Sequence, residues 1–251
     1  MAFLYVILIF YLGSWFASFA YVIGLRIPKD ISLTKRSYCD YCDKQLPFKN
    51  VLPLFGYMIT RGKCSHCQAK IPISYLLYEL LGRLLFIFSY ILIGNLSLEL
   101  LVSFIFITVF LVEVISDIYY KEVIDMAWIV GLVPIVIIRI IQEQFLVYLF
   151  SASILFVSLF LIAYLGKWIF KKEALGGGDI KIYLFIGFVI PIFQGLLSLF
   201  LAAFFGLIYA LIIKIKPGKE MAFIPMIFIG VLLSYFFGDL MIEWYLNLLG
   251  M

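Results

Sequence analysis

Residues 176–179, Gly-Gly-Gly-Asp, place a carboxylate directly after three glycines and between two long apolar runs. An ionisable residue at the edge of a membrane span is costly, so its presence indicates a function. Glycines carry no Cβ, which would let another backbone approach Asp179 closely. A carboxylate presented in this way to an extended peptide suggests proteolysis, and that chemistry requires a second acid.

Asp117 is the candidate for the second acid, 62 positions before Asp179. It follows a predicted span, and Asp179 precedes another, so counting spans puts both carboxylates at one membrane surface. Side by side, they could share one proton and activate a water for attack on a peptide bond. Two like charges in one low-dielectric site push their proton affinities apart, and the resulting values belong to the pair.

Two other interpretations of these residues remain open. Each aspartate could cap a helix end: Asp179 would favour the N-terminus of its own helix through the macrodipole. Asp117 stands at the C-terminus of its own helix, where the macrodipole of that helix does not favour a negative charge. The glycines could instead cradle a phosphate, but no predicted strand precedes them and a carboxylate repels phosphate.

Four cysteines form two knuckles, Cys39-x-x-Cys42 and Cys64-x-x-Cys67, separated by the segment 43–63. This pattern predicts a tetrahedral structural zinc site, or a site for another thiophilic metal. Disulfides are the alternative, and a reducing cytoplasmic location would argue against them. His66 lies inside the second knuckle, where we expect a solvated loop residue and not a ligand.

The composition predicts a polytopic membrane protein. Of the 251 residues 65% are hydrophobic and only 14% are charged, with a mean hydropathy of +1.14; soluble chains carry about 25% charged residues. We therefore expect an all-α fold with about eight transmembrane helices. The expected spans are 2–24, 74–94, 98–116, 126–141, 145–165, a short and a full span within 180–215 separated near Pro191 and Gln194, and 222–237, followed by a short interfacial helix at 240–249.

The positive charges predict an orientation. Seventeen of the 19 lysines and arginines, all but Arg83 and Arg139, fall in segments that the expected spans place on one side. Those segments include Lys172, Lys216 and Lys219. Because loops rich in Lys and Arg are cytoplasmic, the N-terminus is expected outside and both aspartates at the cytoplasmic face.

Together these features resemble the bacterial type IV prepilin peptidase family. Residues 175–181, Leu-Gly-Gly-Gly-Asp-Ile-Lys, resemble its Gly-x-Gly-Asp-hydrophobic-Lys motif. Asp117 followed by residues 123–125, Val-Ile-Asp, resembles its first catalytic aspartate and the element after it, with Ile124 in place of the usual proline. Further matches to its pattern are residues 17–21, 26–28, 36–39 and 61–64, Tyr75 with Glu79, and residues 224–225.

The resemblance implies an aspartic endopeptidase of the inner or cytoplasmic membrane. It would cut the short basic leader from type IV prepilins or pseudopilins of pilus, type II secretion or competence systems. Asp117 and Asp179 would be catalytic, and Gly176, Gly178 and Lys181 would bind substrate. Methylation of the new N-terminus with S-adenosylmethionine is implied by the resemblance alone. The expected partners are these substrates and the lipid bilayer, with no nucleic acid.

The expected domains are a first transmembrane helix (1–24), a cytoplasmic four-cysteine metal-binding domain (25–72) and a transmembrane peptidase core (73–251). Two rival functions remain at this point. A transporter or channel would carry its acidic residues near the bilayer midplane. Both aspartates are instead expected at one membrane boundary, which argues against that function. A structural subunit of a pilus machine would tolerate the loss of either aspartate.

Overall fold

A computed structural model describes residues 2–39, 41–171, 176–214 and 221–250. Its described part is helical, as predicted, and divides into two compact units, residues 1–115 and 116–251. The predictions for Lys172, Leu175, Lys216 and Lys219 lie outside the described residues. Within the described residues, six helices are long and apolar enough to cross a membrane, which confirms a multi-pass protein. These six candidate spans are Leu4–Lys29, Ser74–Ile93, Leu98–Tyr120, Phe145–Ile169, Ile192–Ile213 and Ile224–Leu248.

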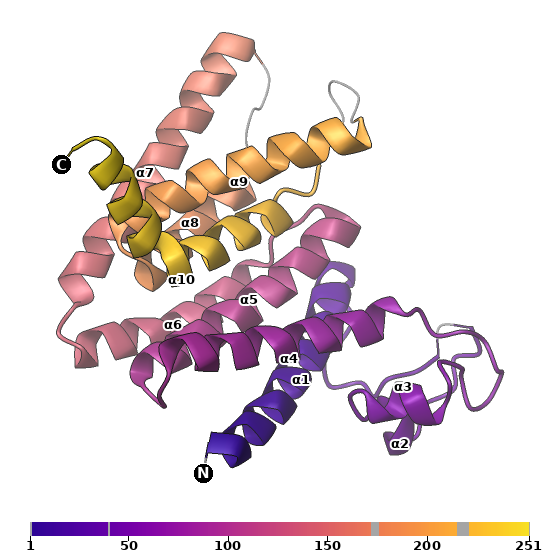
Figure 1. Ribbon diagram of the computed structural model, residues 1–251. Helices are drawn as coiled ribbons and strands as arrows, with labels where there is room; N and C mark the ends of the chain where they lie inside the picture. Colours follow the sequence, from indigo (N-terminus) through magenta and orange to yellow (C-terminus); the bar gives the residue numbers. More distant parts are fainter. Residues whose placement is uncertain (1, 40, 172–175, 215–220, 251) are drawn as a thin grey trace. The chain divides into compact units, whose positions relative to one another are not determined.

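The first unit contains two long helices joined by the cysteine-containing segment, and most of a third long helix. Its elements are α1 (Ala2–Arg26), η1 (Ile27–Lys29), α2 (Phe48–Val51), α3 (Phe55–Ile59), α4 (Ser74–Ile93) and α5 (Leu98–Tyr120), of which α5 continues into the second unit (Figure 1). Small residues let α1 and α4 pack closely, since a Cβ on Gly82 would lie 2.3 Å from the Cβ of Ala17. Such contacts let apolar helices associate in lipid, where hydrophobic burial gives no driving force.

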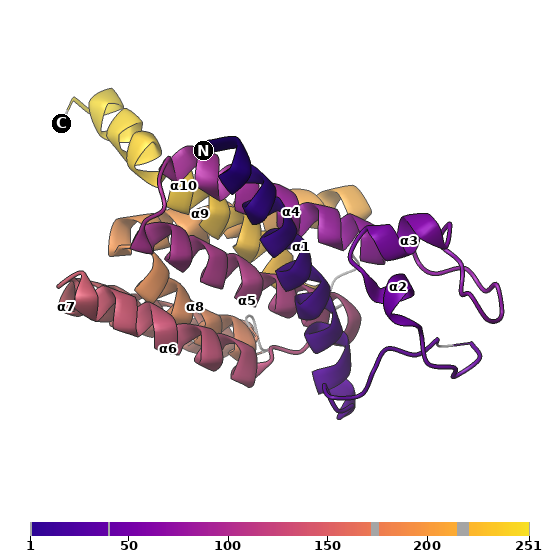
Figure 2. The same ribbon diagram turned by 90° about the horizontal axis from the view of Figure 1, so that it is seen from below.

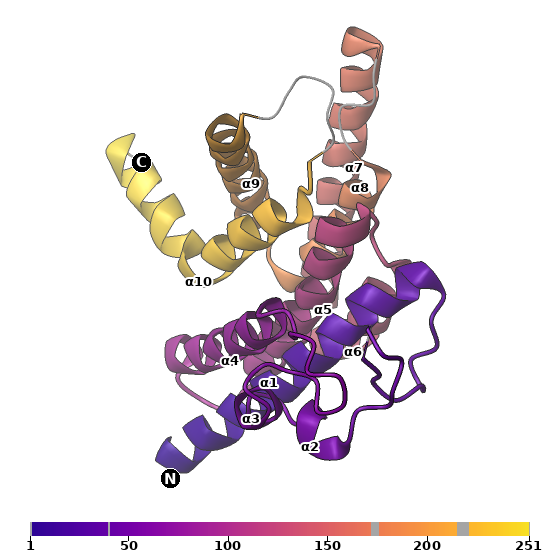
Figure 3. The same cartoon turned by 90° about the vertical axis from the view of Figure 1, so that its right-hand side faces the viewer.

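The described part of the second unit consists of the end of α5 and five further helices. They are α6 (Asp125–Ile141), α7 (Phe145–Phe170), α8 (Gly177–Val189), α9 (Ile192–Ile213) and α10 (Ile224–Leu248) (Figure 2). The apolar block after Asp179 divides where predicted, because α8 ends at Val189 and Pro191 caps α9. The expected separate helix at 240–249 is wrong: α10 continues to Leu248, and Figure 3 shows that it bends along its length instead of breaking.

The helices α6 and α8 correspond to the predicted fourth and sixth spans, but have only 17 and 13 residues. Neighbouring helices satisfy the C-terminal end of α8. Arg139 of α6 is fully buried and donates to the carbonyls of Phe188 and Val189 at 3.1 and 2.7 Å. Ser151 of α7 donates to the carbonyl of Ile190 at 3.0 Å. These bonds replace the water that the last carbonyls of a helix would otherwise need, so a short helix can end inside the second unit.

Candidate functional site

The glycines before Asp179 begin α8 against the loop that joins α5 to α6. Gly176 is the N-cap of α8, and its carbonyl accepts from the Asp179 N–H at 3.2 Å. A Cβ on Gly178 would lie 2.5 Å from Cγ2 of Val123, closer than side chains approach each other. A Cβ on Gly176 would lie 3.1 Å from Oδ2 of Asp179, whereas one on Gly177 would meet nothing within 4 Å. The contact of α8 with Val123 therefore requires glycine at position 178. The contact between position 176 and the Asp179 carboxylate favours glycine there, whereas position 177 could carry a side chain.

Asp117 lies in the last turns of α5, which runs one turn beyond the predicted span to Tyr120. The side chain is only 7% exposed, and its Oδ2 accepts a hydrogen bond of 2.9 Å from the backbone N–H of Ile224. Ile224 is the first residue of α10. Its own helix offers Asp117 no N-terminus, but the chain supplies one 107 residues further on, at the start of α10.

Asp179 lies in the first turn of α8, outside the six candidate spans. Burial and, to a smaller extent, the nearby charge of Asp117 together raise the pKa of its carboxyl from an ordinary value of 3.8 to about 7. The structure thus brings the two predicted aspartates close enough for one charge to act on the other. An uncharged Asp179 beside an ionised Asp117 is the arrangement in which two carboxyls share one proton.

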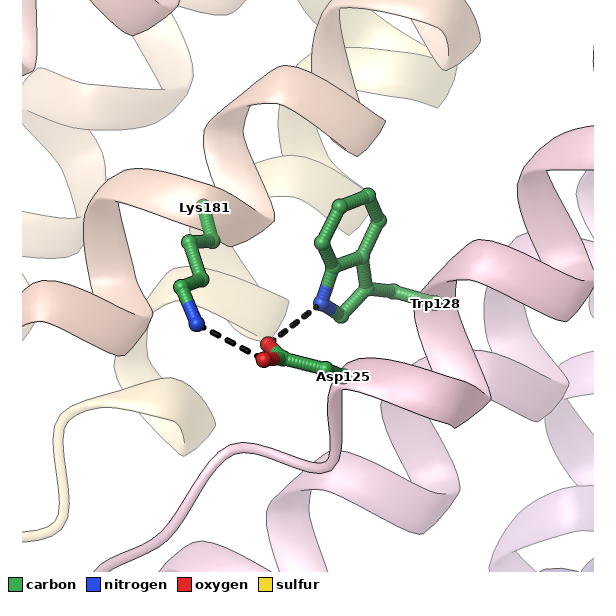
Figure 4. A network of polar contacts seen from close by, with 3 residues as sticks. All are labelled: Asp125, Trp128 and Lys181. Atoms are coloured by element: carbon green, nitrogen blue, oxygen red, sulfur yellow. Dashed lines mark hydrogen bonds and ion pairs between the residues drawn. The ribbon is translucent and has the colours of Figure 1, made fainter.

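Lys181, expected to bind substrate, forms an ion pair with Asp125 in the structure (Figure 4). Its Nζ lies 2.7 Å from Oδ2 of Asp125, and the indole N–H of Trp128 donates to Oδ1 of the same carboxylate at 3.2 Å. Asp125 and Trp128 belong to α6, and Lys181 belongs to α8. This network joins the beginnings of the two helices beside Asp179.

Sequence reasoning missed two contributors to this site. It assigned no role to Trp128, and it noted residues 224–225 only through the family resemblance. The helix N-terminus at Ile224 carries a local signal in Pro225, since proline is common in the first turn of a helix. Nothing local indicates that the Ile224 N–H is directed at Asp117, because their contact depends on how α5 and α10 pack.

The four cysteines converge in the first unit. Their sulfur atoms all lie within 4.8 Å of one another, and Sγ of Cys39 is 3.7 Å from Sγ of Cys67. All four cysteines are free thiols. The structure therefore contains no disulfide among these four residues. Four sulfurs bound tetrahedrally to zinc at about 2.3 Å would be about 3.8 Å apart. The four thiols therefore fit a metal ion of that kind.

The two knuckles have the same local structure. In each, the N–H of the first cysteine donates to a carbonyl five residues later, Lys44 in one and Ala69 in the other. The fourth residue after the first cysteine has a positive φ in both, 52° at Asp43 and 60° at Gln68. Both pairs of cysteines are therefore presented by equivalent turns.

The second knuckle favours a thiolate. The backbone N–H groups of Cys67 and His66 lower the pKa of Cys64 from 9.0 to about 6, and the His66 N–H lies 3.4 Å from that sulfur. The imidazole of His66 belongs to an exposed residue outside the cysteine cluster. A thiolate is the form in which cysteine binds a metal.

Two family profiles together match most of the chain. Residues 11–93 match the bacterial peptidase A24 N-terminal domain, and residues 104–211 match the type IV leader peptidase family. The prepilin leader peptidase/N-methyltransferase of Bacillus subtilis is 28% identical over 96% of this chain and 98% of its own length. That of Vibrio cholerae is 27% identical over 91% and 98%. No solved structure shows significant similarity. The chain belongs to the type IV leader peptidase family, the aspartic peptidases A24.

Proposed function

We propose that this protein removes the short basic leader from type IV prepilins or pseudopilins, with Asp117 and Asp179 as its catalytic acids. The observation that carries the proposal is the convergence of these two carboxyls, in which burial and the charge of Asp117 raise the pKa of Asp179 to about 7. The similar proteins of Bacillus subtilis and Vibrio cholerae bear the name prepilin leader peptidase/N-methyltransferase, which supports this class of substrate.

In the proposed reaction Asp117 is ionised and Asp179 is protonated. Asp117 takes a proton from a water molecule while the water oxygen attacks the scissile carbonyl carbon. Asp179 gives its proton to the carbonyl oxygen, which forms a tetrahedral diol. The carbon–nitrogen bond then breaks with its electron pair on nitrogen, which receives the proton held by Asp117. A diol hydroxyl returns a proton to Asp179, so the pair ends as it began.

The neighbours of each carboxyl support this division of roles. The Ile224 N–H bonds to Asp117, and the positive end of the α10 dipole favours a charged carboxylate there. Glycine at 176 keeps a Cβ away from Oδ2 of Asp179, and glycine at 178 lets the start of α8 pack against Val123, so both hold the backbone close to the carboxyl. We propose that Gly176 and Gly178 border the substrate, and that Lys181 contributes through its ion pair with Asp125.

We propose that Cys39, Cys42, Cys64 and Cys67 hold a structural zinc ion within a cytoplasmic domain spanning residues 25–72. The mutual distances of their sulfur atoms, all within 4.8 Å of one another, support this ligand set. A segment of this size has little hydrophobic core, and a bound metal stabilises such small domains. Zinc would supply structural cross-linking only, and it has no part in peptide hydrolysis.

The distribution of lysine and arginine supports an N-terminus outside and the aspartate pair at the cytoplasmic face of the inner or cytoplasmic membrane. The name of these relatives also supports methylation of the newly exposed N-terminus, and S-adenosylmethionine as the methyl donor is implied by the family resemblance alone. A transporter or a structural subunit is disfavoured, because the chain belongs to a family of peptidases.

The decisive experiment is cleavage of a prepilin-type substrate by membranes that contain the wild type, Asp117→Asn or Asp179→Asn at equal levels. Asparagine has nearly the same shape but cannot exchange a proton as the acid does, so both variants should lose cleavage by several orders of magnitude. Wild-type cleavage by either variant would overturn the two-aspartate mechanism. Transfer of a labelled methyl group to a substrate already cut would report the second activity separately.

A further inference from the structure

The short helix α3 exposes three large apolar side chains although it belongs to the segment between two membrane helices. Phe55, Met58 and Ile59 are 46%, 62% and 61% exposed. So short a helix cannot persist in water by itself, and exposed apolar side chains on it would lower its solubility. Something must hold this helix and cover these side chains.

Glu79 attaches α3 to a membrane helix. Its Oε2 accepts a hydrogen bond of 2.7 Å from the backbone N–H of Leu54, the residue before α3. Glu79 is the sixth residue of α4, which is a candidate span. At the rise of an α-helix, that position lies about 7 Å along the helix from its start. Figure 1 shows α3 beside the end of α4 at which α4 begins.

Helix α1 gives an independent measure of this depth. The side chain of Ser18 lies close enough to Glu79 to act on its carboxyl, and Ser18 precedes Arg26, the first charged residue of α1, by eight residues. Eight helical residues span about 12 Å. The attachment of α3 therefore lies well on the apolar side of Arg26, within the apolar stretches of α1 and α4.

The backbone N–H and carbonyl groups around the start of α3 have the hydrogen-bond partners that a position close to hydrocarbon requires. Leu54 adopts a φ of 65° and a ψ of −56°. The N–H of Phe55 bonds to the carbonyl of Pro53 at 2.8 Å, which closes a tight three-residue turn that is normally strained. The Gly56 N–H donates to the carbonyl of Leu52 at 2.7 Å. Irregular backbone is tolerated near hydrocarbon only when its polar groups have partners.

We infer that α3 is seated in the interfacial layer of the bilayer, with Phe55, Met58 and Ile59 in lipid. Exposed apolar residues at the beginning of α4, Ile73 and Leu77, would face the same layer. The exposed cations that follow α3, Arg61 and Lys63, suit anionic headgroups at its edge. Glu79 is then the residue that holds the cysteine-containing segment against the membrane.

The experiment measures the depth of α3 in lipid nanodiscs of phosphatidylcholine and phosphatidylglycerol. A nitroxide is attached to a genetically encoded keto amino acid at Met58 or Ile59, which leaves the four cysteines untouched. Matched controls carry the label at Leu84, 54% exposed in the middle of α4, and at Tyr41, 75% exposed in the first knuckle. Collisions with oxygen, which partitions into lipid, are compared with collisions with a water-soluble nickel chelate.

Labels at Met58 and Ile59 should have an oxygen-to-nickel collision ratio several times that of the Tyr41 label and approaching that of the Leu84 label. A ratio equal to that of Tyr41 would overturn the inference, since α3 would then lie in water. Protection from both reagents would also overturn it, since protein and not lipid would cover the helix. These results do not depend on cleavage activity, so they are independent of the proposed function.

The role of Glu79 is tested in the same nanodiscs. Glu79→Gln keeps a carbonyl that can accept from Leu54, whereas Glu79→Leu removes the acceptor. The label at Met58 should keep its lipid-like ratio in Glu79→Gln and shift toward water in Glu79→Leu. A lipid-like ratio in both variants would overturn the attachment by Glu79, and a water-like ratio in both would show that the carboxylate charge, not an acceptor at that position, holds α3.

Discussion

Lys181 and Asp125 form an ion pair of 2.7 Å that joins the fifth residue of α8 to the first residue of α6. Both side chains are half exposed, so the pair itself contributes at most about 1 kcal/mol to stability. Its importance is geometric, because Asp179 lies two residues before Lys181. The pair limits how α8 can move relative to α6.

The ion pair predicts the effect of reversing its charges. Lys181→Asp and Asp125→Lys should each lower kcat for leader cleavage about tenfold, because each single variant places two like charges in contact. The double variant should recover most of the rate if the pair positions α8. No recovery would mean that Lys181 acts on the substrate directly. Cleavage is measured in membranes with matched expression.

Gly178 predicts a steric effect with a matched control. Gly178→Ala would place a Cβ 2.5 Å from Val123, and overpacking of this kind costs about 1–3 kcal/mol. Cleavage should fall by at least about tenfold. Gly177→Ala, which meets nothing within 4 Å, should stay close to the wild-type rate. Adding Val123→Ala to Gly178→Ala removes the nearest atom and should restore part of the activity; equal losses at 177 and 178 would contradict this account.

The raised pKa of Asp179 predicts how activity depends on pH. The proposed reaction needs a protonated Asp179, and burial and the charge of Asp117 raise its pKa to about 7. The kcat/KM of leader cleavage should therefore fall as the pH rises through about 7. It should fall again at acid pH, where Asp117 also becomes protonated. A profile that stays flat between pH 6 and pH 9 would contradict a proton held by Asp179.

The same pKa predicts how stability depends on pH. In the folded protein Asp179 keeps its proton up to about pH 7, while the unfolded chain loses it near the ordinary value of 3.8. The folded state therefore binds more protons in that interval, and its stability falls as the pH rises from about 4 to about 7. Asp179→Asn removes this dependence. Its melting temperature relative to wild type should rise between pH 5 and pH 8 in detergent; an unchanged difference would contradict the prediction.

The cysteine cluster predicts one zinc ion per chain. Cys64→Ser or Cys67→Ser should lose the metal, measured by elemental analysis of the purified protein, and should make residues 25–72 sensitive to protease. His66→Ala is the matched control, since His66 is exposed and outside the cluster, and should keep the metal. A strong chelator should reproduce the cysteine variants in the wild type. Full zinc content in both serine variants would exclude this ligand set.

Much of the fold could be predicted from hydropathy and from residues that break helices. The long apolar runs become α1, α4, α5, α7, α9 and α10, and Pro191 separates α8 from α9 as expected. The prediction failed after Phe237, where Gly238 and Asp239 suggested a break. Helix α10 continues there because Gly238 packs against Gln194, whose amide donates to Asp239 at 2.8 Å. Contacts with α9 thus preserve a helix that the local sequence would end.

The sequence by itself determined the helical membrane fold, the two cysteine knuckles and the choice of the two candidate acids. These properties follow from hydropathy and from short spacings between residues, and both depend only on residues that are neighbours in the sequence. Only the tertiary structure decided that Asp179 has a raised pKa, that Lys181 pairs with Asp125 and that the Ile224 N–H bonds to Asp117. A carboxyl's proton affinity depends on its burial and on charges within a few ångströms. Here α5, α6, α8 and α10 supply those groups, and only packing brings these helices together.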